Sequence, residues 1–251
     1  MEKRFPYMYD TPEKPNIFAG LFYCVLCFFT LPFLLSLLQF IDLQTPGLRF
    51  NYELIFHTIN GLVAVLIFRE YLADAFLAVQ IDTRKVLTAA AVGLVCIVVW
   101  LLLAAAVFLL LRSKAGYLTL FYTLPVTELD VFAFSGELVQ ERPLFGTLCT
   151  VLLTPITTCC LFYATAFAPV GNRHPLLPYF TVALVLLFPR LCNAFNFSEL
   201  YIELILYLVQ LPIHWFACRA YQKADSVWAP VFALSAANLL ACALIHLPSL
   251  I

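Results

Sequence analysis

Residues Val86–Leu111 read VLTAAAVGLVCIVVWLLLAAAVFLLL, and no charged side chain interrupts them. A helix needs about 20 consecutive apolar residues to cross the hydrocarbon core of a bilayer. This stretch is long enough for such a crossing. It also lacks the alternation of polar and apolar residues that marks the ~10-residue strands of a membrane barrel. It therefore predicts a transmembrane helix.

Six further apolar runs flank this helix along the chain. They are Ile17–Ile41, Tyr52–Phe68, Leu144–Phe167, Leu176–Phe195, Leu200–Tyr221 and Val227–Leu247. Tyr52–Phe68 is the weakest, because it carries Glu53, His57 and Asn60, and its pattern can extend to Ala78. The sequence thus predicts an all-α, polytopic transmembrane helix bundle of about seven spans.

The overall composition supports this class and excludes others. Hydrophobic residues make up 63% of the chain and charged residues 12%, about half the ~25% usual in soluble domains. So much apolar surface argues against a soluble globular domain. The formal net charge of −1 excludes a nucleic-acid binder that works by neutralising phosphates, so no nucleic acid is expected as a partner.

The apolar runs divide the chain into four parts. We expect a polar tail over residues 1–16, three transmembrane helices over 17–111, a connection over 112–143 and four helices over 144–251. The connection mixes aromatic residues such as Phe121 and Tyr122 with acids such as Glu128 and Asp130. Apolar rings beside charged tips are typical of the membrane–water interface, so we expect the connection to be interfacial.

The Lys and Arg residues between the spans predict the orientation. With the N-terminus inside, the inner segments hold nine of them, namely Lys3, Arg4, Lys14, Arg69, Arg84, Lys85, Arg173, Arg219 and Lys223. The outer segments hold four, namely Arg49, Arg112, Lys114 and Arg142. Inner loops carry the excess of Lys and Arg. We therefore expect an integral protein of the bacterial cytoplasmic membrane with a cytoplasmic N-terminus.

All nine cysteines lie inside the apolar runs. A disulfide framework would place them in loops, whereas buried free cysteines behave as small apolar residues. Cys24 and Cys27 form a CxxC pair, but it is flanked by Phe, Leu and Val inside a predicted span. We interpret the cysteines as packing residues at helix contacts.

Three segments of the C-terminal half follow one another in a recognisable order. Cys159–Ala164 reads CCLFYA, Phe188 follows in the next run, and Asp225–Phe232 reads DSVWAPVF after the basic turn Arg219–Lys223. This order and spacing resemble the CPBP family, which comprises CAAX prenyl proteases and bacteriocin-processing (Abi) membrane proteins. The family's core is four helices carrying EExxxR, FxxxH and HxxxN or HxxxD. The resemblance therefore implies a CPBP-like four-helix core over residues 144–251.

Most catalytic positions of that family are replaced in this chain. The replacements are Cys159 and Cys160 for the two glutamates, Ala164 for the arginine, and Cys192 and Leu234 for the two histidines. Phe188 and Asn238 are kept. In the family a glutamate is thought to activate water while His and Asn hold the oxyanion, and such chemistry needs a general base and polar donors. The resemblance therefore implies a pseudoprotease.

The resemblance also implies a cavity between the later helices. We expect it to take an apolar chain, a lipidated peptide or a partner helix, with the lining residues Phe188, Arg190, Glu203, His214 and Asn238. Pro155, Pro189, Pro212 and Pro230 each fall in one of the last four runs. Proline frees a carbonyl and kinks a helix, which would help to keep such a hollow open.

The polar residues within the spans allow more than one interpretation. Glu199 and Glu203 share a helix face and either complement a helix N-terminus or form a polar cavity mouth. Arg190 either pairs with Glu203 or contacts a substrate or partner. Cys192 as a nucleophile would need a lowered thiol pKa. We interpret His57, Asn60 and His246 as interhelical hydrogen-bonding residues.

The chain contains no HExxH motif and no Cys/His zinc spacing, so we predict neither a metal nor another cofactor. The leading prediction is a non-catalytic membrane subunit or scaffold that binds a partner helix, a peptide or a lipidated substrate. One alternative is a divergent, active CAAX-type intramembrane protease that uses Glu199, Glu203 or His214. The other is a transporter or channel component. The expected partners are the lipid bilayer and a second membrane protein or a lipidated peptide.

Overall fold

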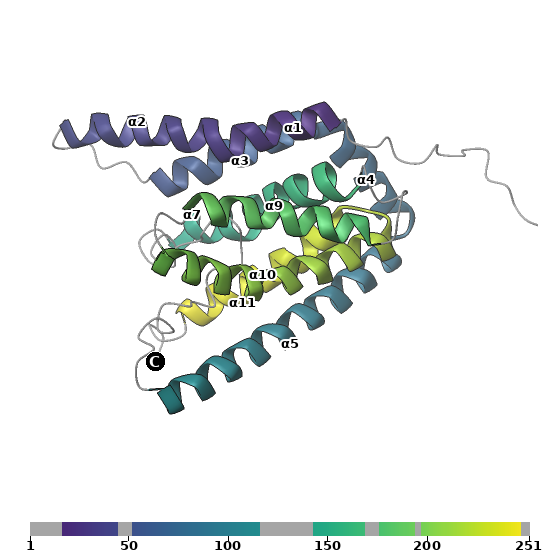
Figure 1. Cartoon of the computed structure of the whole chain (residues 1–251). Helices are drawn as coiled ribbons and strands as arrows, with labels where there is room; N and C mark the ends of the chain where they lie inside the picture. Colours follow the sequence, from purple (N-terminus) through teal and green to yellow (C-terminus); the bar gives the residue numbers. More distant parts are fainter. Residues whose placement is uncertain (1–16, 45–51, 116–142, 169–175, 194–196, 247–251) are drawn as a thin grey trace, which may run out of the picture.

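The structure, a computed structural model, describes residues 17–44, 52–115, 143–168, 176–193 and 197–246. Within these ranges it is all-helical, with 96% of the residues in helices and no strand. The helices lie side by side as a bundle (Figure 1). The predicted all-α class is therefore confirmed for the part of the chain that the structure describes.

The N-terminal half forms three long helical rods and one short helix. Their bounds are α1 Ile17–Val25, continued through the π-helical turn η1 Leu26–Thr30 into α2 Leu31–Gln44, then α3 Tyr52–Ile67, α4 Arg69–Ile81 and α5 Thr83–Ala115. Phe68, with φ −104° and ψ 17°, leaves the helical region and separates α3 from α4. The second apolar run thus ends near Phe68, and α4 is a separate helix rather than its extension.

The C-terminal half forms four rods. The first consists of α7 Pro143–Leu148, η3 Cys149–Leu153, α8 Thr154–Cys159 and η4 Cys160–Phe167, where η3 and η4 are π-helical. The others are α9 Leu177–Asn193, α10 Phe197–Ala224 and α11 Trp228–His246. All four coincide closely with the predicted apolar runs, because a long run of helix-compatible apolar residues is a local signal that needs no tertiary information.

Two boundaries differ from the expectation. Helix α5 continues through residues 112–115, which the sequence predicts as the beginning of the connection. The next residue is Gly116, and no strong helix breaker precedes it. Pro230 lies in the first turn of α11, where proline is tolerated because its missing N–H would have no intrahelical partner. It therefore does not interrupt that helix. The rest of the predicted connection and the tail lie outside the described residues.

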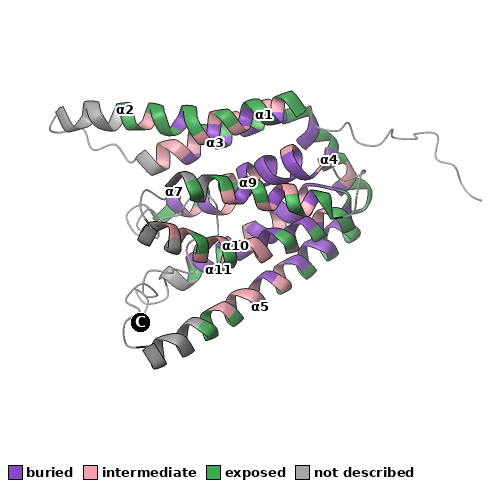
Figure 2. Ribbon diagram, viewed as in Figure 1, coloured by how far each residue is buried: buried purple, intermediate pink, exposed green. Residues whose placement is uncertain are grey.

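Three of the rods are long and apolar enough to cross a membrane, namely Ile17–Leu37, Thr83–Val107 and Pro143–Phe167. Shorter apolar helices cover Leu54–Ile67, Leu177–Phe188 and Trp228–Ala243. Many large apolar side chains face outward on these helices, among them Phe18, Leu66 and Leu102. Figure 2 shows such exposed residues along α1 and α5. Outward apolar faces on helices of this length indicate a protein that associates with a membrane.

The rods pack in a definite order. Helices α1 to α3 lie on one side of the bundle and α5 on the other, with α7 to α11 between them (Figure 1). Glycine allows the closest approaches. A Cβ on Gly93 of α5 would lie 3.2 Å from the Cβ of Ala220 on α10 and 3.5 Å from that of Ala233 on α11. Small residues at such crossings let membrane helices approach until their backbones nearly touch.

Candidate functional site

Residues Cys159–Ala164, the first motif segment, belong to the α7–η4 rod and lie in the interior of the bundle. Cys159 and Cys160 are 0% exposed and Ala164 is 1% exposed. Leu234 of α11 is also buried, at 3%. Cys192 belongs to α9, but its side chain lies outside the described residues. The positions at which the resemblance places glutamates, arginine and a histidine are therefore thiols and apolar groups enclosed by protein.

Aromatic rings occupy the space next to this turn. The rings of Phe162 and His214 lie 4.6 Å apart between centroids, and the Tyr163 hydroxyl lies 3.3 Å from His214 Nδ1. Tyr163 also stacks on Tyr221 at 6.3 Å. These contacts join η4 to α10. His214, one of the predicted cavity residues, is fully buried within this aromatic group.

Asn238, the kept asparagine of the last motif, makes a structural contact. Its Nδ2 donates to the backbone carbonyl of Thr150 in η3 at 2.8 Å. The N–H of Thr154, which would reach that carbonyl in an α-helix, bonds instead to the carbonyl of Cys149. The following residue, Pro155, has no N–H. Asn238 therefore satisfies a buried carbonyl that its own helix leaves open.

The polar residues of α3 pair across helices, as predicted for His57 and Asn60. Tyr23 Oη donates to Asn60 Oδ1 at 2.8 Å, and Cys27 Sγ approaches the same oxygen at 3.1 Å. His57 Nδ1 lies 3.5 Å from Thr154 Oγ1 of α8. These are interhelical hydrogen bonds, so this prediction is confirmed for both residues. The side chain of His246 lies outside the described residues.

The eight cysteines whose side chains the structure describes form no disulfide. Cys27, Cys149, Cys159, Cys160, Cys218 and Cys242 are buried, while Cys24 and Cys96 are half-buried. Cys27, the second cysteine of the CxxC pair, faces Asn60 on α3. This arrangement agrees with the interpretation of these eight cysteines as packing residues.

The other residues that are predicted to line the cavity lie in different parts of the bundle. Phe188 of α9 is 43% exposed, and its ring meets those of Phe28 and Phe29 of η1 at 5.7 and 6.0 Å. Glu203 is half-buried on α10. The side chains of Arg190, Glu199 and Cys192 lie outside the described residues, so the predicted pairing of Arg190 with Glu203 stays a prediction. Phe188 thus contacts η1, His214 contacts η4, and Asn238 contacts η3.

Three hydrogen bonds join α4 to the end of α10, to the turn that follows it and to the start of α11 at one end of the bundle. The hydroxyls of Tyr71 and Tyr221 lie 3.0 Å apart. Ser226 Oγ donates to the carbonyl of Ala75 at 3.1 Å, and Trp228 Nε1 donates to that of Leu72 at 3.0 Å. These contacts could not be predicted from the sequence, because they join residues about 150 positions apart in the chain.

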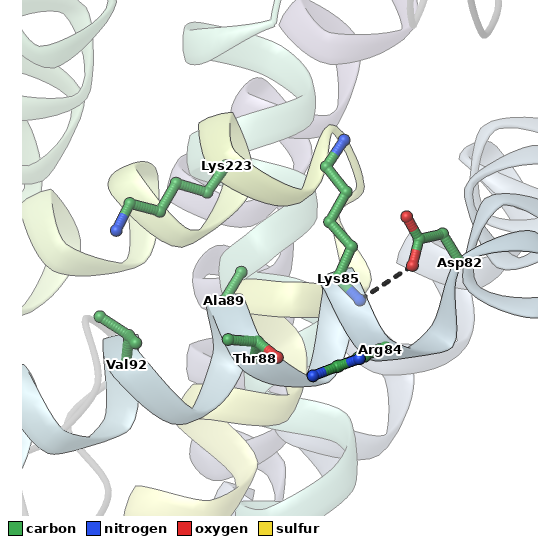
Figure 3. Close-up of a pocket in the computed structure, with 7 residues that line it drawn as sticks. All are labelled: Asp82, Arg84, Lys85, Thr88, Ala89, Val92 and Lys223. Carbon is green, nitrogen blue, oxygen red and sulfur yellow. Dashed lines mark hydrogen bonds between the residues drawn. The ribbon is translucent and has the colours of Figure 1, made fainter.

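A pocket of about 460 Å³ lies at this same end of the bundle (Figure 3). Its lining residues are Asp82, Arg84, Lys85, Thr88, Ala89, Val92 and Lys223. In the sequence, Arg84, Lys85 and Lys223 served only to predict the orientation. The feature that could have indicated this pocket is the charged Asp82–Lys85 segment, which directly precedes the longest apolar run. Within the described residues, no three His, Cys, Asp or Glu side chains gather as they would around a metal ion.

No family model, no curated protein and no solved structure matches this chain. The resemblance to the CPBP family therefore rests on the motif residues alone. It stays a prediction, as does the four-helix core that it implies.

Proposed function

We propose that this chain is a non-catalytic integral membrane subunit, a pseudoprotease related to the CPBP family that binds a partner transmembrane helix. The proposal includes seven spans and a cytoplasmic N-terminus. Its premise is that the core keeps the helical frame of a membrane protease without the groups that hydrolysis requires.

The observation that carries the proposal is the burial of the motif positions. Hydrolysis of an amide needs a base that reaches water and donors that reach the oxyanion. Cys159, Cys160, Ala164 and Leu234 are enclosed by protein and offer neither a carboxylate nor an imidazole. Aromatic rings fill the neighbouring space. Asn238 is the one polar motif residue that is kept, and its side-chain amide donates a hydrogen bond to the carbonyl of Thr150.

The proposed docking surface is an aromatic patch on the outside of the bundle. It consists of Phe28, Phe29 and Phe33 from the first rod and Phe188 from α9. Phe29 and Phe33 are 55% and 63% exposed. The rings of Phe28 and Phe29 already contact that of Phe188 where the first rod meets α9, and this contact offers a preformed apolar surface. Association of helices in lipid depends on such close packing.

Catalytic inactivity is tested with the purified full-length chain. We expect no cleavage of prenylated CAAX peptides or of transmembrane peptides, with an active CPBP protease as the positive control. Turnover that Glu203→Gln or His214→Ala abolishes would overturn the proposal and support the divergent protease.

Partner binding is tested by photo-crosslinking in intact membranes. A photoreactive residue at Phe29 or Phe188 should give one discrete adduct with a second membrane protein. The same residue at Leu102, which is 65% exposed on the far helix α5, is the matched control and should not give that adduct. Identical adduct patterns from Phe29 and Leu102 would contradict the proposed surface.

A further inference from the structure

The pocket at the start of α5 is lined by two segments that are far apart in the chain. Arg84 and Lys85 come from the first turn of α5, whereas Lys223 comes from the last turn of α10 (Figure 3). Thr88, Ala89 and Val92 continue along α5 from this first turn. The pocket therefore exists only because the two helix ends meet.

The pocket carries an excess of positive charge. Its lining has three cations and one carboxylate, a net charge of +3 − 1 = +2. Asp82 Oδ1 accepts the backbone N–H of Lys85 at 3.0 Å, so this carboxylate caps the helix. Among the described residues the salt bridge is Arg69–Glu70, outside the pocket. Arg84, Lys85 and Lys223 are exposed, and no ion pair among the described residues engages them, so they can attract an anion.

The pocket also has an apolar floor at the edge of a membrane span. The part of α5 that is long and apolar enough to span a membrane begins at Thr83. Ala89 is buried in a small apolar cluster against which Trp228 packs, and Val92 is exposed one turn further along the helix. Tryptophan is enriched at the level of the lipid headgroups. Cations at the mouth and apolar groups toward the bilayer match the order of groups in a phospholipid.

We propose that this pocket binds an anionic phospholipid, with its phosphate between Arg84, Lys85 and Lys223 and an acyl chain along Val92. Arginine can hold phosphate oxygens through two parallel hydrogen bonds, while lysine supplies point charges. Basic pockets between membrane helices bind acidic headgroups in this way. The apolar floor favours a lipid over free phosphate, because inorganic phosphate has nothing to place against Val92. The inference stands apart from the proposed function and needs only that α5 spans the membrane.

The test measures binding of fluorescent phosphatidylglycerol by the full-length chain in a neutral detergent, with phosphatidylcholine as the neutral comparison. Each cation removed near a headgroup should weaken binding about fivefold, so R84Q/K85Q/K223Q should weaken it about a hundredfold. The matched control is Arg69→Gln, which removes an exposed cation outside the pocket and should leave binding within about twofold, because Glu70 already compensates Arg69. Elution as a single species on gel filtration confirms that each variant is folded.

Two further measurements distinguish binding of a lipid from binding of free phosphate. Inorganic phosphate should not displace the lipid at concentrations at which dioctanoyl phosphatidylglycerol does. Val92→Asn should weaken lipid binding several-fold with the three cations intact. The proposal is overturned if the triple variant binds phosphatidylglycerol like the wild type or if phosphatidylcholine binds equally well. It is also overturned if inorganic phosphate competes as strongly as the short-chain lipid, since the site would then be a phosphate site.

Discussion

Asn238 donates its side-chain amide to the carbonyl of Thr150, whose usual α-helical donor, the N–H of Thr154, bonds to the carbonyl of Cys149 instead. The resemblance to the CPBP family would assign such an asparagine to catalysis. In this chain its amide compensates for two local features, the π-helical turn η3 and Pro155. The observed role of Asn238 thus follows from the polar groups that surround it in the bundle.

This role predicts a coupling between two residues. Asn238→Leu should destabilise the protein by about 1–3 kcal/mol, the penalty for a buried polar group left without a partner. Pro155→Ala supplies an N–H for the same carbonyl, so Asn238→Leu should cost less in that background. Denaturation in mixed micelles measures the four members of this cycle.

The control for this cycle is Leu240→Ala, a change of an outward-facing residue on the same helix, which should change stability by less than about 0.5 kcal/mol. Equal destabilisation by Asn238→Leu with and without Pro155 would contradict the role that we assign to Asn238.

Among the helices that the structure describes, π-helical turns occur in two rods. They are residues 26–30 between α1 and α2, and residues 149–153 and 160–167 in the α7–η4 rod. A π-turn leaves some carbonyls without their usual donors and is frequent at functional sites. In the α7–η4 rod, Asn238 bonds to one of them. These irregularities need particular partners across the bundle, and hydropathy alone does not indicate them.

Close helix crossings depend equally on single small residues. The Cβ introduced by Gly93→Ala would lie 3.2 Å from that of Ala220, so we expect a modest destabilisation by that variant and a large one by Gly93→Leu. Overpacking of this kind typically costs about 1–3 kcal/mol. The melting temperature in detergent measures both effects.

Two variants make this prediction specific. Ala220→Gly should relieve part of the cost of Gly93→Ala, because it removes the methyl group that the new Cβ meets. Val95→Leu adds bulk on an outward face of the same helix and should have little effect. A Gly93→Leu protein that melts like the wild type would show that α5 does not pack closely here.

For the molecule as a whole, the decisive feature is that basic residues far apart in the sequence line one pocket at one end of the bundle. Lys85 and Lys223 line one pocket, and α4 is tied to the turn beside it. The orientation analysis placed both residues on the inner side from charge counting alone. Their juxtaposition supports the proposed topology.

We therefore expect opposite labelling at the two ends of α5. In right-side-out vesicles, a membrane-impermeant maleimide should not label Lys85→Cys or Lys223→Cys but should label Arg112→Cys. The 33 residues of α5 span about 50 Å at 1.5 Å per residue, enough to place Lys85 and Arg112 on opposite sides. The wild-type chain, treated in the same way, gives the background labelling of the native cysteines.

Labelling of Lys85→Cys and Lys223→Cys from different sides would contradict the structure itself. Labelling of both from outside, with Arg112→Cys protected, would contradict only the predicted orientation. The two outcomes separate the arrangement of the bundle from its direction in the membrane.

The sequence by itself determined the helices and their approximate ends, because a long apolar run is a local property of the chain. It also indicated that His57 and Asn60 would bond across helices, since a polar group in an apolar helix needs a partner. Phe68 as a break and the continuation of α5 to Ala115 are small departures within the usual uncertainty of helix ends.

Only the tertiary structure decided which helix faces meet. It pairs Asn238 with Thr150, joins Tyr71 to Tyr221, and buries Cys160 completely. It also places Lys223 and Lys85 on the lining of one basic pocket. Apolar helices in lipid have many nearly equivalent ways to pack. The choice among them depends on small residues such as Gly93 and on hydrogen bonds across the bundle, which form only once the helices are side by side.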